Sequence, residues 1–78
     1  MIAAPLMVHR DGEKKLWGVF QFDALPSPGD RIDITAHDGR VQQLTVTYVA
    51  HQPLHEKAPQ QPDHHTSWVH AEWVSEFY

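Results

Sequence analysis

The chain has 78 residues, of which 41% are hydrophobic and 21% are charged, so it can form one small folded domain and no second core. The absence of cysteine excludes disulfides, Cys-containing zinc sites and thiol catalysis. Six basic and ten acidic residues give a formal net charge of −4. This balance opposes a dedicated nucleic-acid binder, because such affinity comes mostly from phosphate neutralisation.

The first residues predict neither a signal peptide nor a membrane anchor. No basic residue precedes the apolar stretch that begins at Met1, and Pro5 interrupts this stretch early. No apolar run along the chain approaches the roughly 20 residues that a membrane-spanning helix needs. We therefore expect a cytoplasmic protein that does not contact a membrane.

The first two predicted elements are strands joined at Asp11-Gly12, a dipeptide typical of tight hairpin turns. A three-residue loop that also includes Glu13 would place Val8 opposite Leu16 and would align the other apolar positions in the same register. Even-numbered apolar side chains then face the interior on both strands. These predicted interior residues are Ile2, Ala4, Leu6, Val8, Leu16, Phe20 and Phe22.

A turn-forming segment at 24–30, with two prolines and a glycine, separates this hairpin from a second one. Apolar residues alternate with polar ones on both sides of Asp38-Gly39, which predicts the turn of the second hairpin. A three-residue loop there places Ile34 opposite Leu44. The apolar residues of the alternating face are Ile32, Ile34, Leu44, Val46, Tyr48 and Ala50.

The rest of the chain contains a low-complexity segment and one ambiguous element. Three prolines within 52–65 forbid a regular helix or a central strand, so this segment is predicted to be an exposed loop. Residues 66–74 fit a strand with Val69, Ala71 and Trp73 on one face, or a helix with two of these on one side. We predict the strand, because a fifth strand would cover a sheet edge.

Together these elements predict a single all-β domain over residues 1–78, with five antiparallel strands in two hairpins plus a closing strand. The simplest arrangement is a small barrel that is SH3-like or partly open. A helical C-terminal segment remains the alternative to the fifth strand.

The first hairpin leaves an apolar surface on its odd-numbered side. In the predicted register Met7 lies opposite Trp17, and Pro5 lies opposite Val19. Trp68 is a second aromatic residue predicted to face outward. Trp and Met on an outer face are typical of a contact surface, whereas the bent strands of a small barrel would bury the same side chains.

These residues predict a non-enzymatic interaction module that binds a protein partner or itself, with a homodimer as one form. The predicted contact residues are Pro5, Met7, Trp17, Val19 and Trp68. Aromatic residues in such a set would dominate the binding energy if they become buried at the centre of an interface.

Catalysis is not predicted, and no cofactor is expected. Ser67, His70 and Asp63 have the residue types of a hydrolytic triad, but no nucleophile-elbow or oxyanion-hole motif accompanies them. The four glycines are scattered singly, which excludes a phosphate-cradling loop.

Two further functions are alternatives. Arg10, Lys14 and Lys15 cluster at the first hairpin tip beside Trp17, and a basic tip with an aromatic platform can hold single-stranded nucleic acid. Histidine-mediated metal binding is the other alternative, although the spacing matches no zinc motif and no metal site is assigned. The histidines concerned are His51, His55, His64, His65 and His70.

Overall fold

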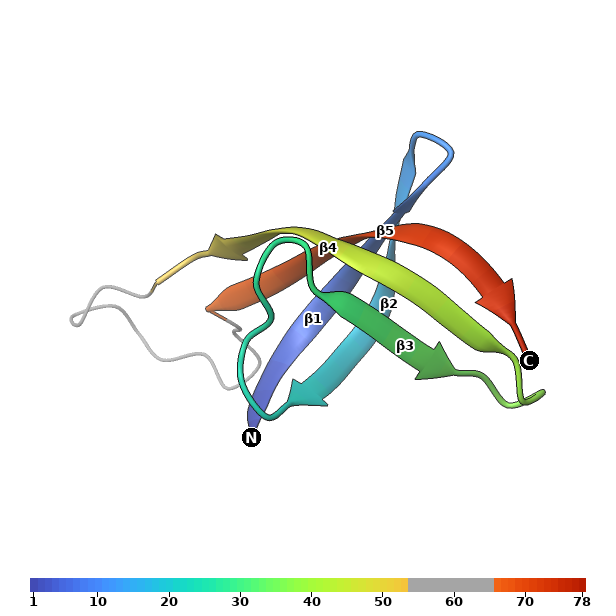
Figure 1. The fold of residues 1–78 in the computed structure, drawn as a ribbon. Helices are drawn as coiled ribbons and strands as arrows, with labels where there is room; N and C mark the ends of the chain where they lie inside the picture. The colour runs from blue at the N-terminus through green and yellow to red at the C-terminus, as the bar shows by residue number, and fades with distance from the viewer. Residues whose placement is uncertain (54–65) are drawn as a thin grey trace.

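The structure is a computed structural model that describes residues 1–53 and 66–78, and all of its regular elements are strands (Figure 1). They are β1 (Ile2–Arg10), β2 (Glu13–Phe22), β3 (Arg31–Thr35), β4 (Val41–His51) and β5 (Ser67–Phe77). No helix occurs in the described ranges, so the all-β prediction is confirmed and the helical alternative for the final segment is wrong. Most of the predicted 52–65 loop lies outside the described residues.

The five strands form one sheet in the order β2-β1-β5-β4-β3, which curls into a half-barrel (Figure 1). The two hairpins are antiparallel, and β5 runs antiparallel to β4 but parallel to β1. The prediction of an entirely antiparallel sheet is therefore wrong. β5 follows β4 and reverses its direction, and this direction coincides with that of β1 on its other side.

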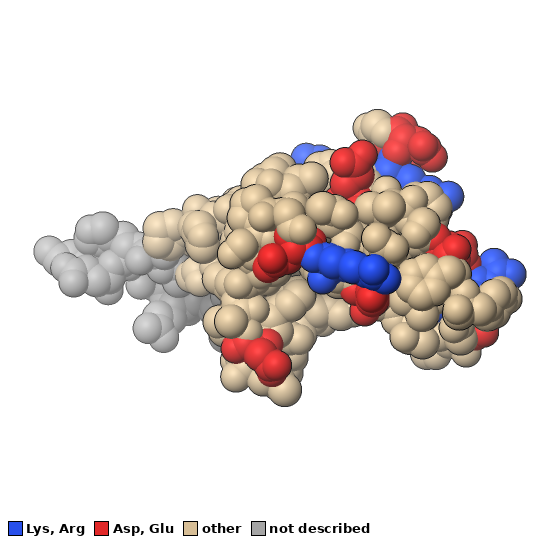
Figure 2. All heavy atoms as spheres, viewed as in Figure 1, with Lys and Arg blue, Asp and Glu red and all other residues tan. Residues whose placement is uncertain are grey.

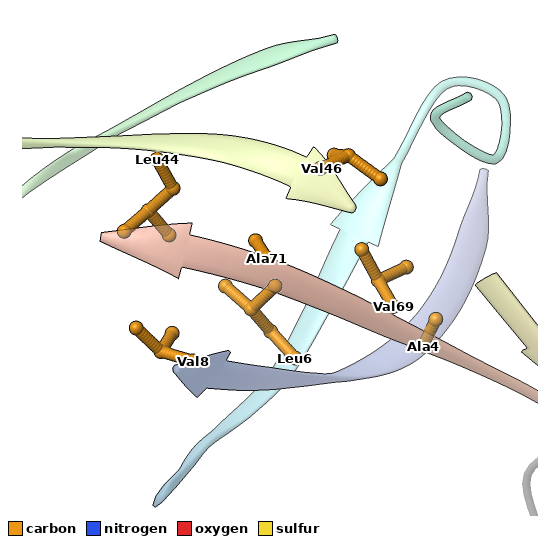
Figure 3. Close-up of a cluster of buried hydrophobic side chains, with 7 residues drawn as sticks. All are labelled: Ala4, Leu6, Val8, Leu44, Val46, Val69 and Ala71. Carbon is orange, nitrogen blue, oxygen red and sulfur yellow. The ribbon is translucent and has the colours of Figure 1, made fainter. Parts of the chain in front are cut away.

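The core lies on the inner face of the curl, where seven apolar side chains from β1, β4 and β5 are buried together (Figure 3). They are Ala4, Leu6, Val8, Leu44, Val46, Val69 and Ala71. Half-buried aromatic and aliphatic side chains from β2 and β3 pack around this cluster. Each fully buried Leu or Val contributes about 1.5–3 kcal/mol, so a core of this size gives a small margin of stability.

The first hairpin turns through Asp11 and Gly12 alone, one residue fewer than predicted. Both residues have positive φ angles, 54° and 81°, as a two-residue type I′ turn requires. The register from Ile2 to Leu6 nevertheless agrees with the prediction, with Ala4 opposite Phe20, for example. The shorter turn and the predicted register are compatible because a β-bulge lies between the turn and this part of the hairpin.

The bulge lies at Trp17. Leu6 pairs with Gly18, but the next residue, Met7, pairs with Leu16, which leaves Trp17 as the extra residue of β2. Met7 and Leu16 therefore share the outer face, with Leu16 50% exposed, while Trp17 packs against the core cluster. The predictions that Trp17 faces outward and that Leu16 faces inward are both wrong, because the bulge shifts the alternation by one residue.

The second hairpin keeps the predicted alternation but shifts its register by two residues. Its loop has the expected odd length, yet it spans 36–40, so Ile32 rather than Ile34 lies opposite Leu44. Gly39 donates a backbone hydrogen bond to Ala36 (3.0 Å), which closes the turn inside this longer loop. A two-residue shift preserves the facing side chains, so both isoleucines still pack against the core.

The β4–β5 pairing has two irregularities, and the one between Val46 and Tyr48 changes the alternation along β4. Beyond it Val49 pairs with Val69 and packs against the core, whereas Ala50 pairs with Trp68 on the outer face. The prediction that Tyr48 and Ala50 share a face with Val46 is therefore wrong.

The bulge predicts that substitutions of two neighbouring residues differ in how much they destabilise the fold. Trp17→Ala should lower the free energy of unfolding by about 2–3 kcal/mol, because it removes a side chain packed on the core. Leu16→Ala should lower it by less than about 0.5 kcal/mol, as expected for an exposed position. Urea denaturation of both variants measures the difference, and equal losses would contradict the placement of the bulge.

Candidate functional site

The convex side of the half-barrel, here called the outer face, carries the side chains of β2, β1, β5 and β4 that point away from the core. Cross-strand pairing arranges them in rows that run across neighbouring strands. The first row contains Val19, Pro5, Trp68 and Ala50, the second Leu16, Met7, His70 and Tyr48, and the third Lys14, His9 and Glu72.

Several large apolar side chains of the outer face are exposed to solvent. Leu16 and Val19 of β2 are 50% and 53% exposed, and Tyr48 of β4 is 48% exposed. Between these two strands lie the half-buried Met7 of β1 and Trp68 of β5. Scattered exposed hydrophobic residues are normal in proteins, but a patch that is continuous across strands is typical of a binding surface.

Four of the five predicted contact residues lie on the outer face. Val19 is the most exposed of them, and Met7 and Trp68 are half-buried. Pro5 is less than 2% exposed and offers little contact area. Trp17, the fifth, packs on the opposite side of the sheet.

The position of Pro5 within β1 explains why a proline is tolerated there. The pairing of β1 with β5 begins at Leu6, one residue later. Pro5 therefore lies just outside the hydrogen-bonded part of the β1–β5 ladder, where its missing N–H is not needed, and this is the edge-like position that proline requires in a sheet.

A cluster of three rings occupies the middle of the outer face. A hydrogen bond of 3.0 Å joins His9 Nε2 and His70 Nδ1, so one of these nitrogens carries the proton and the other accepts it. The Tyr48 ring stacks on His70, with centroids 4.2 Å apart and an interplanar angle of 14°. The cluster combines β1, β4 and β5, so spacing along the sequence gave no signal for it.

The environment of His70 favours its neutral form. Burial lowers the pKa of His70, and the charges of His9 and Lys14 lower it further. His9 lies between two charged residues in the third row, with Lys14 on one side and Glu72 on the other. His70 lies in the neighbouring second row.

The predicted catalytic and metal residues do not come together where the structure describes them. Ser67 and His70 point to opposite sides of β5, and Ser67 Oγ instead hydrogen-bonds His51 Nδ1 (3.1 Å). Residues 1–53 and 66–78 contain no group of three or more His, Asp or Glu side chains that could hold a metal ion. The remaining candidates, Asp63, His55, His64 and His65, lie outside the described residues.

The basic tip of the first hairpin forms one wall of a groove of about 300 Å³ on the inner side. The groove is lined by Val8, Arg10, Asp11, Glu13, Lys15 and Trp17. Its two basic and two acidic side chains balance, and the Arg10 guanidinium lies 3.8 Å from the centre of the Trp73 ring. Figure 2 likewise shows acidic and basic side chains interspersed on the face in view. This pattern does not favour a phosphate backbone.

Comparisons with known proteins add no relatives. The chain matches no family model, no curated protein and no solved structure. In the described part of the chain, no helix has the length and hydropathy that a membrane span requires.

The lowered pKa of His70 predicts that stability falls in mild acid. The unfolded chain binds a proton at this imidazole more readily than the folded chain does. The stability that comes from keeping His70 neutral is therefore present above pH 6.5, the ordinary pKa of histidine, and is lost as the pH falls below that value. His70→Gln should therefore show a flatter dependence of melting temperature on pH between 7.5 and 5, measured by circular dichroism.

The matched control is His37→Gln, because His37 is exposed in the loop between β3 and β4 and lies outside the ring cluster. This control should keep the pH dependence of the unsubstituted protein. An unchanged slope in His70→Gln would show that the ring cluster does not govern the acid sensitivity.

Proposed function

We propose that the protein is a small, non-enzymatic interaction module that binds a protein partner through its outer face. The observation that carries the proposal is the continuous apolar patch across β2, β1, β5 and β4, in which Leu16, Val19 and Tyr48 are each about half exposed. The narrower assignment to SH3-like barrels stays a prediction, because the chain matches no solved structure, and the proposal does not depend on it.

The energetics favour reversible binding. Complete burial of a large apolar side chain contributes about 1.5–3 kcal/mol, so a side chain that is already half-buried contributes about 1 kcal/mol when a partner covers the rest. The five residues concerned, Leu16, Val19, Tyr48, Met7 and Trp68, together give about 5 kcal/mol. This sum is near the lower bound of the free energy lost on association, so the binding that it supports is weak and reversible.

The proposal is tested by photo-crosslinking from the outer face. A photo-reactive phenylalanine analogue at Leu16, in the full chain at its natural level in its own cells, should form a discrete adduct with a protein. Val19→Asp should remove most of that adduct, because it places a charge in the same apolar patch.

Thr35→Asp is the matched control, since Thr35 is also β-branched and exposed but lies on β3, the opposite edge strand. Its adduct yield should equal that of the unsubstituted chain. The proposal is wrong if no adduct forms, or if Val19→Asp leaves the yield unchanged while the variant remains folded.

A further inference from the structure

We infer that the partner on the outer face is a second copy of this chain, packed face to face about a two-fold axis that runs along β1. The inference rests on the proposed function and adds the identity of the occupant. It follows from the charged residues of the third row of the outer face and from the apolar residues of the first and second rows.

Lys14 and Glu72 flank His9 on opposite sides of the outer face. His9 pairs with Lys14 of β2 and with Glu72 of β5, so the backbones of the two charged residues lie two strand spacings apart, about 10 Å. In the described residues the ion pairs involve Arg10, Arg31 and Arg40, and neither Lys14 nor Glu72 takes part in one.

A two-fold axis along β1 brings these charges together between two copies. The rotation lays β2 of one copy over β5 of the other, so Lys14 meets Glu72 of the second copy and, by symmetry, Glu72 meets Lys14. Two complementary ion pairs form without any change of the fold. Complementary charges of this kind set the register of an interface more than its affinity.

The same rotation matches the apolar rows. Val19 lies over Trp68 of the second copy, and Leu16 lies over His70, while the two Met7 side chains meet near the axis. The exposed side chains of β2 thereby cover the half-buried aromatic residues of β5. One symmetry operation thus satisfies both the charged and the apolar rows, which distinguishes a second copy from an unrelated apolar partner.

The curvature of the sheet limits the size of the contact and hence its strength. Two convex faces touch along a strip about three strands wide and one strand long, or about 15 Å by 30 Å. This is smaller than the roughly 800 Å² per partner of a standard stable interface, so the dimer belongs to the weak, transient class. We expect a dissociation constant in the range of about 10–500 µM.

Charge exchange between Lys14 and Glu72 tests the arrangement by sedimentation equilibrium at low salt. The unsubstituted chain should pass from monomer to dimer between about 10 µM and 1 mM, and added salt should weaken the dimer. Lys14→Glu and Glu72→Lys should each weaken association by about tenfold or more, because like charges then face each other. The double variant Lys14→Glu/Glu72→Lys should restore it to near the original value.

Lys15→Glu is the matched control, since it makes the same change of net charge in a residue that lines the inner groove. It should leave the dissociation constant unchanged. A chain that stays monomeric up to 1 mM overturns the inference, and so does a dimer that the double variant fails to restore. In the first case a crosslinked adduct with a different protein would leave the proposed function intact, so the two failures are distinguishable.

Discussion

β5 joins two hairpins that would each be marginal on their own. It pairs with β1 on one side and with β4 on the other, and it contributes Val69 and Ala71 to the centre of the core. Without this insertion, Leu6 and Leu44 would belong to separate ribbons with no shared interior. The position of β5 between β1 and β4 explains the parallel pairing with β1 and the half-barrel curl. It also explains why His9 and His70 are neighbours.

Bulges determine which side chains the outer face presents. A strand without the irregularity at Trp17 would place Leu16 inside and the indole outside, and an unbroken alternation along β4 would point Tyr48 into the core. The extra residues instead turn Leu16 and Tyr48 outward while Trp17 fills space beside the core. The exposed apolar patch is thus a product of local irregularity on a regular sheet.

The outer face combines apolar area with two charges, those of Lys14 and Glu72, that form no ion pair among the described residues. The three arginines form ion pairs or ring contacts, whereas Lys14 and Glu72 lie on either side of His9. An apolar patch drives association, and its flanking charges decide orientation. Under the proposed function, this division of roles would let a surface of modest area select one partner.

The sequence by itself determined the strands, the two hairpins and the parity of β1 and β5, because apolar alternation and Asp-Gly turns are local signals. It also contained an unused sign of the first bulge in Gly18, a lone glycine in a strand with a φ of 130°. Only the tertiary structure decided the direction of β5 relative to β1 and the meeting of His9, Tyr48 and His70. Those contacts join residues up to 61 positions apart, and no local periodicity encodes which distant strands become neighbours.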